Sequence, residues 1–522
     1  MLSALPTAAL VLALAVAPVA MAAARLGGSV PARKARRSAA VLAAGAFAAL
    51  GLEAYALTGT STSIPGFEVS AFSGLVLVLV LGMGATVMGF SSRSLRDEPY
   101  QERFAVLGAG LVGTGSALAL TTDLFVVAAA WVATSLLTVA LIRTGPRAGR
   151  DARSVRSLRA FTIGDVLLVV AVLTLAATTG STSIAAVGSA PGPELAAAGI
   201  LLVLAAATRS ASGPFVRWLP DSLGAPTPSS ALLHAGIVNA GAVLLIKLTP
   251  AVAGTVPAAT TALVVGGLTC VFAEAVMLTR PDVKGRLAWS TIAQMAFTMV
   301  LCGLGLTIAA ALHLVAHGFY KGALFLGSGT AVRGFVRQRS APPVERQSTA
   351  SRRWITMASF AVVGTAMVVT GRLFGVTITA NLAVPVGLAW VAAGCATAAW
   401  LERAATPGQR VAAIFSIGGM ASLFVCFTAA LESAVAPSLA GVDPALSPLW
   451  VLPVLAALVL VAFTRSESPH DSRLLAHAWT IARAAGRPTS PKQASLPRLT
   501  SWRPARRAQP VGEPALSRLT EV

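Results

Sequence analysis

The chain has 522 residues, of which 55% are hydrophobic and only 11% are charged, and its formal net charge is +20. Soluble domains carry about 25% charged residues, so this composition excludes an ordinary soluble globule and predicts a polytopic membrane protein. The basic excess lies largely in the connections and the C-terminal tail. That distribution indicates positive-inside topology rather than nucleic-acid binding, for which the sequence has no recognition motif.

Hydropathy predicts an all-α fold of about 14–15 transmembrane helices, because the apolar runs lack the period-two alternation of membrane strands. The predicted spans are 4–23, 38–58, 70–90, 104–121, 123–142, 159–178, 195–222, 228–248, 256–279, 286–304, 306–331, 354–371, 383–401, 410–431 and 447–464. The first span lacks the basic n-region of a signal peptide and is predicted to be a membrane helix.

Residues 1–464 are expected to form one transmembrane domain, followed by a basic cytoplasmic tail at 465–522. The tail is expected to be partly disordered from Pro488, with a candidate amphipathic helix at 472–485 on the membrane surface. Arg and Lys clusters follow the first, third and fifth spans and recur at 280–286, at 333–353 and in the tail.

This alternation of charge predicts a cell-membrane protein with its N-terminus outside and its C-terminus in the cytoplasm. Arg372 is the main exception, because the same topology places it outside or in the membrane. The 333–353 loop and the tail are the expected contact regions for a cytoplasmic partner.

Three ionisable residues lie in the apolar run 306–331. His313, His317 and Lys321 are spaced at i, i+4 and i+8, so a helix presents all three on one face. An ionisable group at membrane depth costs about 2.5–3.5 kcal/mol or more and marks ion or proton paths. Imidazoles titrate near neutrality, and burial can bring a lysine to do so, so the pattern predicts a proton relay.

The same spacing of His313, His317 and Lys321 allows two other interpretations. The histidines can be core residues bonded to the backbone, with Lys321 extending to the cytoplasmic interface. Histidines at i, i+4 also suit zinc, but Leu314 stands where the glutamate of an HExxH motif would be, and no third ligand is near in sequence. No metal site is therefore predicted in this chain.

The seventh predicted span contains Arg209, Gly213, Pro214 and Pro220 and is expected to break near its middle. Broken spans beside an ionisable residue are a recurring feature of transporter sites. Arginine stays protonated, so Arg209 is expected to be a fixed charge that tunes a neighbour, with extension toward the cytoplasm as the alternative.

The following span is expected to begin with Thr227 as N-cap and Pro228 at the first helical position. The twelfth span, with Gly364, Gly371 and Arg372, is expected to be a weaker counterpart of the broken seventh span. Spans four to eight and nine to thirteen would then form two inverted five-helix repeats.

Further ionisable side chains are candidates for the same path. Glu274, two turns before Arg280, is a relay candidate, with a local ion pair between the two as the alternative. His234 is a relay candidate or a polar packing contact among small residues. Lys247 ends its span and is expected to extend to the outer interface, although a place in the proton path is the alternative.

Three acids complete the set. Asp165 and Glu53 lie within or near predicted spans as candidate partners of a buried charge, and Asp123 is expected to cap the fifth span. The four cysteines lie scattered in apolar runs and are expected to be packing thiols. No nucleotide, Fe–S or haem motif is present, so no cofactor is expected in this chain and the energy must come from an ion gradient or a partner.

Three blocks of the sequence resemble the proton-conducting antiporter-like subunits of respiratory complex I, multi-subunit sodium/proton antiporters and membrane hydrogenases. The blocks are Trp-Leu-Pro-Asp at 218–221 with the Pro-Thr-Pro-Ser-Ser segment that leads to His234, the 282–295 segment around Leu-Ala-Trp-Ser-Thr, and 312–321. The resemblance covers residues 100–335. It implies an antiporter-like fold with proton transfer, in which the motif residues Pro214, Pro220, Asp221 and Pro228 are structural.

Segments 234–241 and 312–321 further resemble the DabB-type membrane subunits of bacterial inorganic-carbon accumulation complexes. That resemblance implies a DabA-like cytoplasmic partner, a zinc protein related to β-carbonic anhydrases. It also implies that protons or sodium ions flow inward through the membrane subunit and drive one-way hydration of carbon dioxide to bicarbonate. The chain would then be a transporter subunit and not an enzyme by itself.

The chain departs from the complex I pattern at three points. Arg209 stands where a lysine is usual, residues 130–133 lack the glutamate of the fifth span, and Arg372 is the nearest candidate for the lysine of the twelfth span. A complete complex I style pump is therefore not expected. The alternatives are a proton-translocating subunit of an NADH-quinone oxidoreductase, hydrogenase or sodium/proton antiporter complex, and a non-conducting membrane scaffold.

Overall fold

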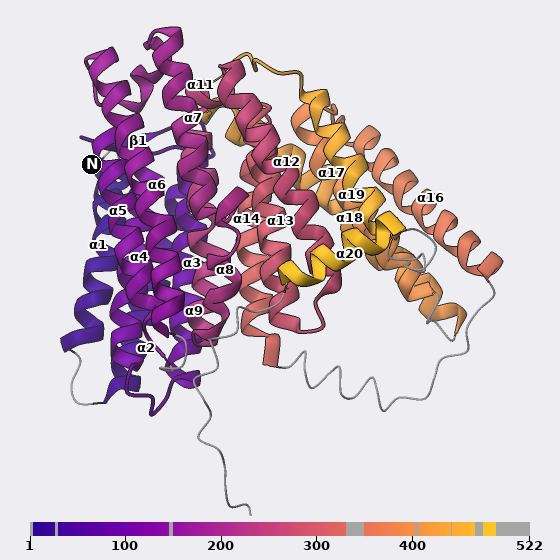
Figure 1. Ribbon diagram of the computed structural model, residues 1–522, viewed down its shortest axis with the longest axis horizontal. Coiled ribbons are helices and arrows are strands. Elements are labelled where there is room, and N and C mark those ends of the chain that lie inside the picture. Colours follow the sequence, from indigo (N-terminus) through magenta and orange to yellow (C-terminus); the bar gives the residue numbers. More distant parts are fainter. Residues whose placement is uncertain are drawn as a thin grey trace, which may run out of the picture. The chain divides into compact units, whose positions relative to one another are not determined.

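The computed structural model describes residues 4–26, 30–145, 150–329, 349–401, 406–439, 441–464 and 473–486. The part described is almost wholly helical (Figure 1). Its sheet content is a two-stranded antiparallel hairpin that pairs Thr62 with Val69 and Ile64 with Phe67. The predicted partner loop 333–353 lies largely outside the described residues, as does the tail from Pro488.

The first part of the chain forms α1 to α7. Its elements are α1 (Ala4–Leu26), α2 (Pro31–Ala56), β1 (Thr62–Ile64), β2 (Phe67–Val69), α3 (Ala71–Ser94), α4 (Gln101–Leu120), α5 (Leu124–Ile142), α6 (Arg150–Thr179), η1 (Ile184–Ser189) and α7 (Gly192–Arg209).

Short helical pieces follow α7, and long helices then resume. These elements are η2 (Gly213–Phe215), α8 (Trp218–Asp221), η3 (Ser222–Gly224), α9 (Thr227–Leu232), η4 (Leu233–Ile237), α10 (Asn239–Lys247), α11 (Thr249–Val252), α12 (Val256–Thr279), α13 (Val283–Gly303) and α14 (Thr307–Leu326). The last part holds α16 (Thr349–Leu373), α17 (Ala380–Leu401), α18 (Pro407–Val435), η5 (Ala436–Ser438), η6 (Pro448–Trp450), α19 (Val451–Thr464) and α20 (Arg473–Gly486).

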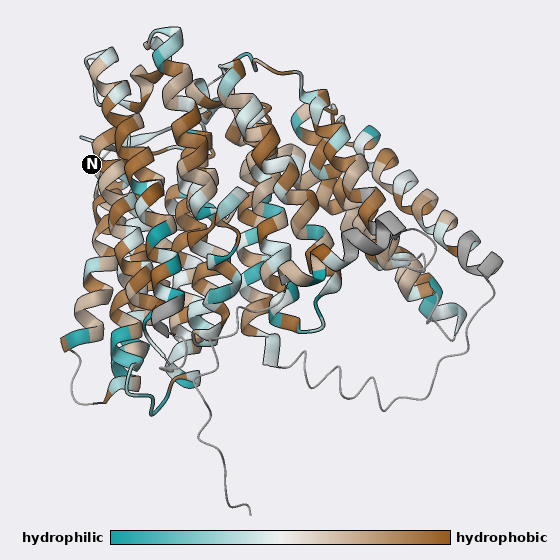
Figure 2. Cartoon of the chain, viewed as in Figure 1, coloured by the Kyte–Doolittle hydropathy of each residue, from teal (hydrophilic) through white to brown (hydrophobic). Residues whose placement is uncertain are grey.

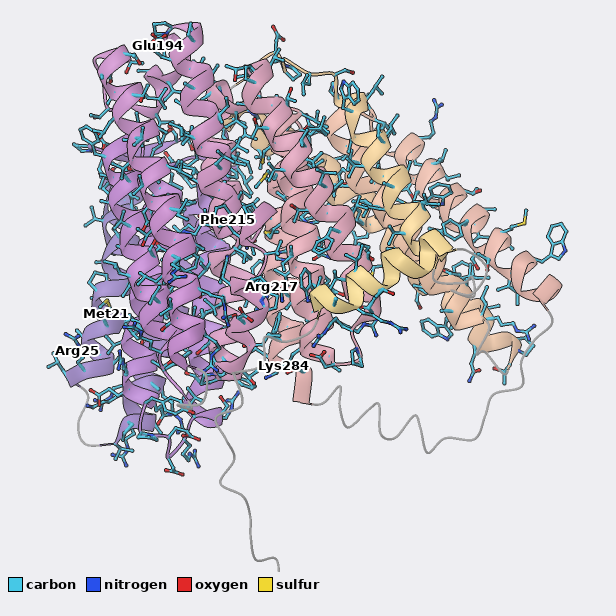
Figure 3. The ribbon with its side chains drawn as sticks, viewed as in Figure 1. Met21, Arg25, Glu194, Phe215, Arg217 and Lys284 are labelled. Carbon is cyan, nitrogen blue, oxygen red and sulfur yellow. The ribbon has the colours of Figure 1, made fainter. Side chains whose placement is uncertain are left out.

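Thirteen helical segments among the described residues are long and apolar enough to cross a membrane. Two further predicted spans fall on α13, which begins with the charged residues Lys284 and Arg286, and on the 14-residue α19. The all-α polytopic architecture is therefore confirmed. Figure 2 shows apolar residues along the middle of the helices, with hydrophilic residues gathered toward one end. Figure 3 places Arg25 and Lys284 toward that end and Glu194 at the opposite end.

The break predicted in the seventh span is present. Helix α7 ends at Arg209, and the chain then turns through positive φ at Ala211 (50°) and Gly213 (59°). Positive φ is strained for alanine, so surrounding contacts must hold this turn. Pro214 lies in η2 and Pro220 in α8, where neither interrupts a long helix.

An aromatic residue stabilises the end of α7. The indole Nε1 of Trp218 donates to the carbonyl oxygen of Thr208 at 2.8 Å, and the Ser212 amide donates to Ala207 at 2.8 Å. Trp218 also packs edge-to-face on Phe161 with ring centroids 4.8 Å apart. These contacts satisfy carbonyl groups that the helix end leaves open in an apolar environment.

The next span contains a π turn. Helix α9 begins at Thr227 with Pro228 in its first turn, one residue from the predicted boundary. The expected capping bond from Thr227 is wrong, because its hydroxyl instead accepts a bond from the Lys284 ammonium at 3.0 Å. Residues Leu233–Ile237 form η4, closed by a bond from the Val238 amide to the Leu233 carbonyl at 3.2 Å.

The break predicted in the twelfth span is wrong. Helix α16 runs unbroken through Gly364 and ends two residues after Gly371, with Arg372 in its last turn. Glycine weakens a helix by about 1 kcal/mol but keeps its amide donor, and α16 contains no proline. Gly364 serves packing instead, since a Cβ there would lie 2.9 Å from Nε1 of Trp390 on α17. The two inverted repeats stay a prediction.

The predicted amphipathic helix in the tail is present as α20, which packs against α12 and runs across the upright helices (Figure 1). The guanidinium of Arg280 donates both to the Gly486 carbonyl at the end of α20 and to the Asp282 carboxylate. Asp282 in turn caps α13 by accepting the Gly285 amide at 2.7 Å. One arginine thus joins α20 to the turn between α12 and α13.

Candidate proton-transfer site

Helix α14 carries the three residues predicted to form a relay. His317 and Lys321 are 3% and 1% exposed, and His313 lies one turn toward the helix N-terminus. The rings of His313 and His317 are nearly parallel, at 12°, with centroids 6.1 Å apart. The predicted common face is therefore confirmed.

A side chain from another helix holds His317. The Oδ1 atom of Asn239 lies 3.2 Å from Nδ1 of His317, and Nδ2 of Asn239 donates to the Ala235 carbonyl at 2.8 Å. Sequence reasoning missed Asn239 as a site residue. The sequence did contain an indication of this role, because a buried amide in an apolar span, five residues after His234, needs a polar partner.

His234 joins the same cluster. It is fully buried, and its ring stacks on Phe325 with centroids 4.2 Å apart. Neither ring nitrogen has a hydrogen-bond partner among the described residues. His234 also interacts electrostatically with His317 and Lys321. The structure thus brings together three histidines from two separate spans.

Lys321 forms the other end of the cluster. Its ammonium donates to the Ser290 hydroxyl of α13 at 2.5 Å and interacts electrostatically with Glu274 of α12. Glu274 also interacts with Arg286. The alternative in which Glu274 pairs with Arg280 is wrong in this structure, since Arg280 binds Asp282 and the end of α20.

A cavity of about 810 Å³ lies beside this cluster, among α12, α13, α14, α17, α18 and α19. Its wall is mostly apolar, and Glu274, Gln294 and His313 face into it. Leu301 and Ala309 line the cavity near the α13–α14 turn. Glu274 lines it near the C-terminal end of α12, which lies on the other side of the bundle from that turn. The cavity therefore runs along the helices from that turn to the depth of the Glu274 carboxylate.

A second buried charge cluster surrounds Arg209. Its guanidinium donates to the Trp131 carbonyl at 2.8 Å, to the Ser135 hydroxyl and to Asp165 Oδ1 at 3.3 Å. The rings of Trp131 and Phe161 lie 4.7 Å and 4.5 Å from the guanidinium carbon. Arg209 is completely buried, so the alternative in which it extends to the cytoplasm is wrong.

Lys247 is partly exposed and extends to the C-terminal end of α4. Its ammonium donates to the Ala119 carbonyl at the end of α4, at 2.7 Å, and interacts with Glu68. A cation at this position satisfies the carbonyl groups of a helix C-terminus. The structure thus gives Lys247 a capping contact of its own.

The remaining predicted residues have structural surroundings. Asp123 caps α5 by accepting the Phe125 and Val126 amides at 2.8 Å and 3.0 Å, as predicted. Burial raises the pKa of Asp123, but hydrogen bonds from the Thr182 hydroxyl and from those two amides lower it by more. The net shift of the Asp123 pKa is therefore downward. Asp221 pairs with Arg156 at 2.5 Å.

Glu53 is an acid for which the described part of the chain shows no hydrogen-bonding partner. It is 6% exposed on α2, and its carboxylate oxygens have no hydrogen-bond partner among the described residues. The carboxylate lies against Gly74 in the first turns of α3. For metals, no group of three or more His, Cys, Asp or Glu side chains in the described ranges is arranged as a ligand set.

These features define a class: a polytopic membrane protein whose described residues include a broken span beside a buried arginine and a line of titratable groups, His313, His317 and Lys321, on one helix face. The family model described as "NADH:quinone oxidoreductase/Mrp antiporter, TM" matches residues 121–399. The chain belongs to this family. The matched region contains Arg209, His234, Glu274 and the α14 line.

Among curated relatives, the chain is 32% identical over 281 residues to the probable inorganic carbon transporter subunit DabB1 of Halothiobacillus neapolitanus. This match covers 51% of this chain and 49% of that protein. It is 49% identical over 142 residues to the probable inorganic carbon transporter subunit DabB of Hydrogenovibrio crunogenus, 27% of each chain. It is 29% identical over 277 residues to NADH-quinone oxidoreductase subunit L of Mycobacterium tuberculosis, 51% of this chain and 43% of that protein.

The match to the first of these relatives spans about half of its length. Among solved structures, the Mrp complex of Dietzia sp. shares the fold with a TM-score of 0.58 at 22% identity, covering 92% of this chain and 59% of that chain. The antiporter-like fold is thereby confirmed over nearly the whole chain.

Proposed function

We propose that this chain is the membrane subunit of an ion-driven inorganic carbon accumulation complex and that protons cross it along α14. The observation that carries the proposal is the line His313–His317–Lys321, whose last two members are buried and whose Lys321 interacts with Glu274. It lies in a chain whose relatives include inorganic carbon transporter subunits. Buried ionisable groups are costly in a membrane and are retained where they conduct.

The path begins in the cavity that His313 faces and continues through His317 and Lys321 to Glu274. In the predicted topology the α13–α14 turn lies outside and Arg286 lies near the cytoplasm, so protons move inward along α14. The ring centroids of His313 and His317 lie 6.1 Å apart, which is too far for a direct hydrogen bond between ring nitrogens, so transfer between them uses a bridging water or a ring rotation. Sodium is the alternative ion, with Glu274 and Gln294 as its oxygen donors.

Arg209 has a different role in this proposal. An arginine side chain keeps its proton, and here the guanidinium is held by Trp131, Ser135 and Asp165. Arg209 supplies a fixed charge in the first half of the bundle, while the mobile proton passes along His313, His317 and Lys321 of α14.

The partner in this proposal is a DabA-like cytoplasmic protein that carries zinc, so the active complex is a hetero-oligomer. Inward ion flow through the membrane subunit drives one-way hydration of carbon dioxide by the partner and leaves bicarbonate in the cell. This chain brings no cofactor of its own and is a transporter subunit rather than an enzyme. The turn joined to α20 by Arg280 lies on the proposed cytoplasmic side and is available for docking.

The relative named NADH-quinone oxidoreductase subunit L favours a second candidate, a proton-translocating subunit of a redox or sodium/proton antiporter complex. Affinity purification of the tagged protein from native membranes, with metal analysis, separates the two. A stoichiometric zinc protein and growth at ambient carbon dioxide that depends on this chain support the first. Co-purifying Fe–S or quinone-reducing subunits contradict it and support the second.

A third possibility, a non-conducting scaffold, makes a different prediction. Replacing His317 and Lys321 then leaves growth at ambient carbon dioxide unchanged, because only the surfaces that hold the partner matter.

A further inference from the structure

We propose that Asn239 is a positioning residue that holds His317 as the Nδ1–H tautomer and so reserves Nε2 as its proton-accepting atom. The inference deepens the proposed function, because it names the atom through which the relay loads. It follows from three features: the orientation of one amide, the limited chemistry of its oxygen, and the local shape of the helix that carries it.

The orientation of the Asn239 amide follows from its contact with Ala235. The amide group lies 2.8 Å from the Ala235 carbonyl oxygen, which can only accept a hydrogen bond. The NH2 group must therefore face Ala235, since the reverse orientation would set two oxygens against each other. The oxygen Oδ1 is left to face the imidazole of His317.

The tautomer of His317 follows from that oxygen. Oδ1 is an acceptor, so Nδ1 of His317, 3.2 Å away, must carry the hydrogen that forms the bond. In a neutral imidazole, Nε2 then holds a free lone pair. Nε2 of His317 is buried and has no hydrogen-bond partner among the described residues. A proton that arrives at His317 is accepted there without breaking the bond to Asn239.

The backbone explains why the two side chains meet. The π turn Leu233–Ile237 adds about one residue to the turn, which rotates the following residues by about 100° relative to a regular helix. Asn239 begins the helix directly after it. On the facing helix, Gly318 permits close approach, because a Cβ there would lie 3.1 Å from the Ala235 carbonyl oxygen.

Several charged or titratable groups surround His317. His313 and Lys321 lie on its own helix, His234 lies on the facing span, and Glu274 of α12 acts on Lys321. A positive charge on His313, His234 or Lys321 opposes a proton on His317, whereas the uncharged Asn239 does not. Asn239 therefore directs the proton to one atom and leaves these neighbours to control when His317 is charged.

The experiment uses the full chain, purified with its partner and embedded in lipid, with 15N-labelled histidine. The chain has five histidines, and His317→Gln identifies the signal of His317 by its loss. We expect solid-state NMR of the neutral form to show a protonated Nδ1 and an unprotonated Nε2. In Asn239→Leu we expect a mixture of both tautomers and a loss of ion flux of about tenfold or more, by analogy with general acid–base groups.

A rescue variant separates positioning from folding. Asn239→Asp keeps an acceptor opposite Nδ1, so we expect it to retain the Nδ1–H tautomer and more flux than Asn239→Leu, with the pH profile of flux moved to higher pH by the added negative charge. An Nε2–H tautomer in the wild type, or an unchanged tautomer in Asn239→Leu, overturns the inference.

The same spectra distinguish this inference from the proposed function. If the tautomer is Nδ1–H but His317→Gln conducts at the wild-type rate, Asn239 positions His317 and the relay is wrong. If His317→Gln stops ion flux but the tautomer is Nε2–H, the relay stands and the role given to Asn239 is wrong.

Discussion

The guanidinium of Arg209 lies 3.3 Å from the carboxylate of Asp165, and the Ser135 hydroxyl bridges the two by donating to the same carboxylate oxygen at 2.6 Å. Arg209 ends one half of a broken helix and Asp165 lies on α6, so the pair joins two spans inside the apolar bundle. A buried pair is costly to break from one side, because the remaining charge is left without compensation.

The first prediction tests this pair. Asp165→Asn leaves Arg209 charged and buried, and we expect a loss of stability of about 3–5 kcal/mol. Thermal unfolding of the detergent-solubilised chain measures it. The control is Lys34→Gln, which removes the more exposed pair between Lys34 and Glu102 at 2.9 Å and should cost about 0–1 kcal/mol. Equal losses in the two variants contradict the structural role of Asp165.

The second prediction concerns Lys321. Lys321→Arg keeps the positive charge, but an arginine side chain does not release its proton near neutral pH. We therefore expect ion flux to fall about tenfold or more, as in Lys321→Met. Flux is measured as pH change inside vesicles that contain the complex. Tyr320→Phe changes the exposed neighbouring residue and should leave flux intact. Wild-type flux in Lys321→Arg would mean that Lys321 supplies only a fixed charge.

The third prediction concerns the cavity beside His313. Ala389 on α17 lines it, and Ala389→Trp places a large ring inside. We expect slower ion flux, at least severalfold, with the complex still assembled, because the approach to His313 is filled. Ala396→Trp on the exposed side of the same helix is the matched control. If both variants conduct equally, ions do not use this cavity.

The fourth prediction concerns α20. Arg280→Gln removes the charged donor from the Gly486 carbonyl and from Asp282, at a cost of about 1 kcal/mol in docking α20. We expect amide hydrogen exchange in residues 473–486 to rise roughly fivefold. Arg483→Gln, which changes an exposed arginine on α20, should leave exchange there nearly unchanged. Exchange that rises equally in both variants argues against Arg280 as the link.

The fifth prediction follows from the lowered pKa of Asp123. A carboxyl whose pKa is lower in the folded chain stabilises it above the unfolded pKa of about 4, and this contribution is lost as pH falls through the folded value. We expect Asp123→Ala to lower stability by about 1 kcal/mol at pH 7 and by less below pH 4. Melting temperatures of both proteins across this range provide the measurement, and a difference that does not shrink in acid contradicts the assignment.

Much of the architecture could be predicted because a bilayer leaves the backbone few choices. Spans must be helical and about twenty residues long, so hydropathy alone located the thirteen helical segments of the described residues that are long and apolar enough to cross a membrane. The break after Arg209 was predictable because proline removes an amide donor. The break expected at Gly364 was wrong because glycine keeps its donor, and only contact with Trp390 shows why glycine stands there.

Local spacing likewise determined that His313, His317 and Lys321 share one face, since the period of the helix is a property of the backbone. Which groups meet that face is a matter of tertiary packing. Only the folded chain sets Asn239 against His317, Ser290 against Lys321 and Asp165 against Arg209, because these partners lie 78, 31 and 44 residues apart. The sequence determined which groups are buried in the membrane, and tertiary structure decided their partners, because hydrogen bonds form between neighbours in space.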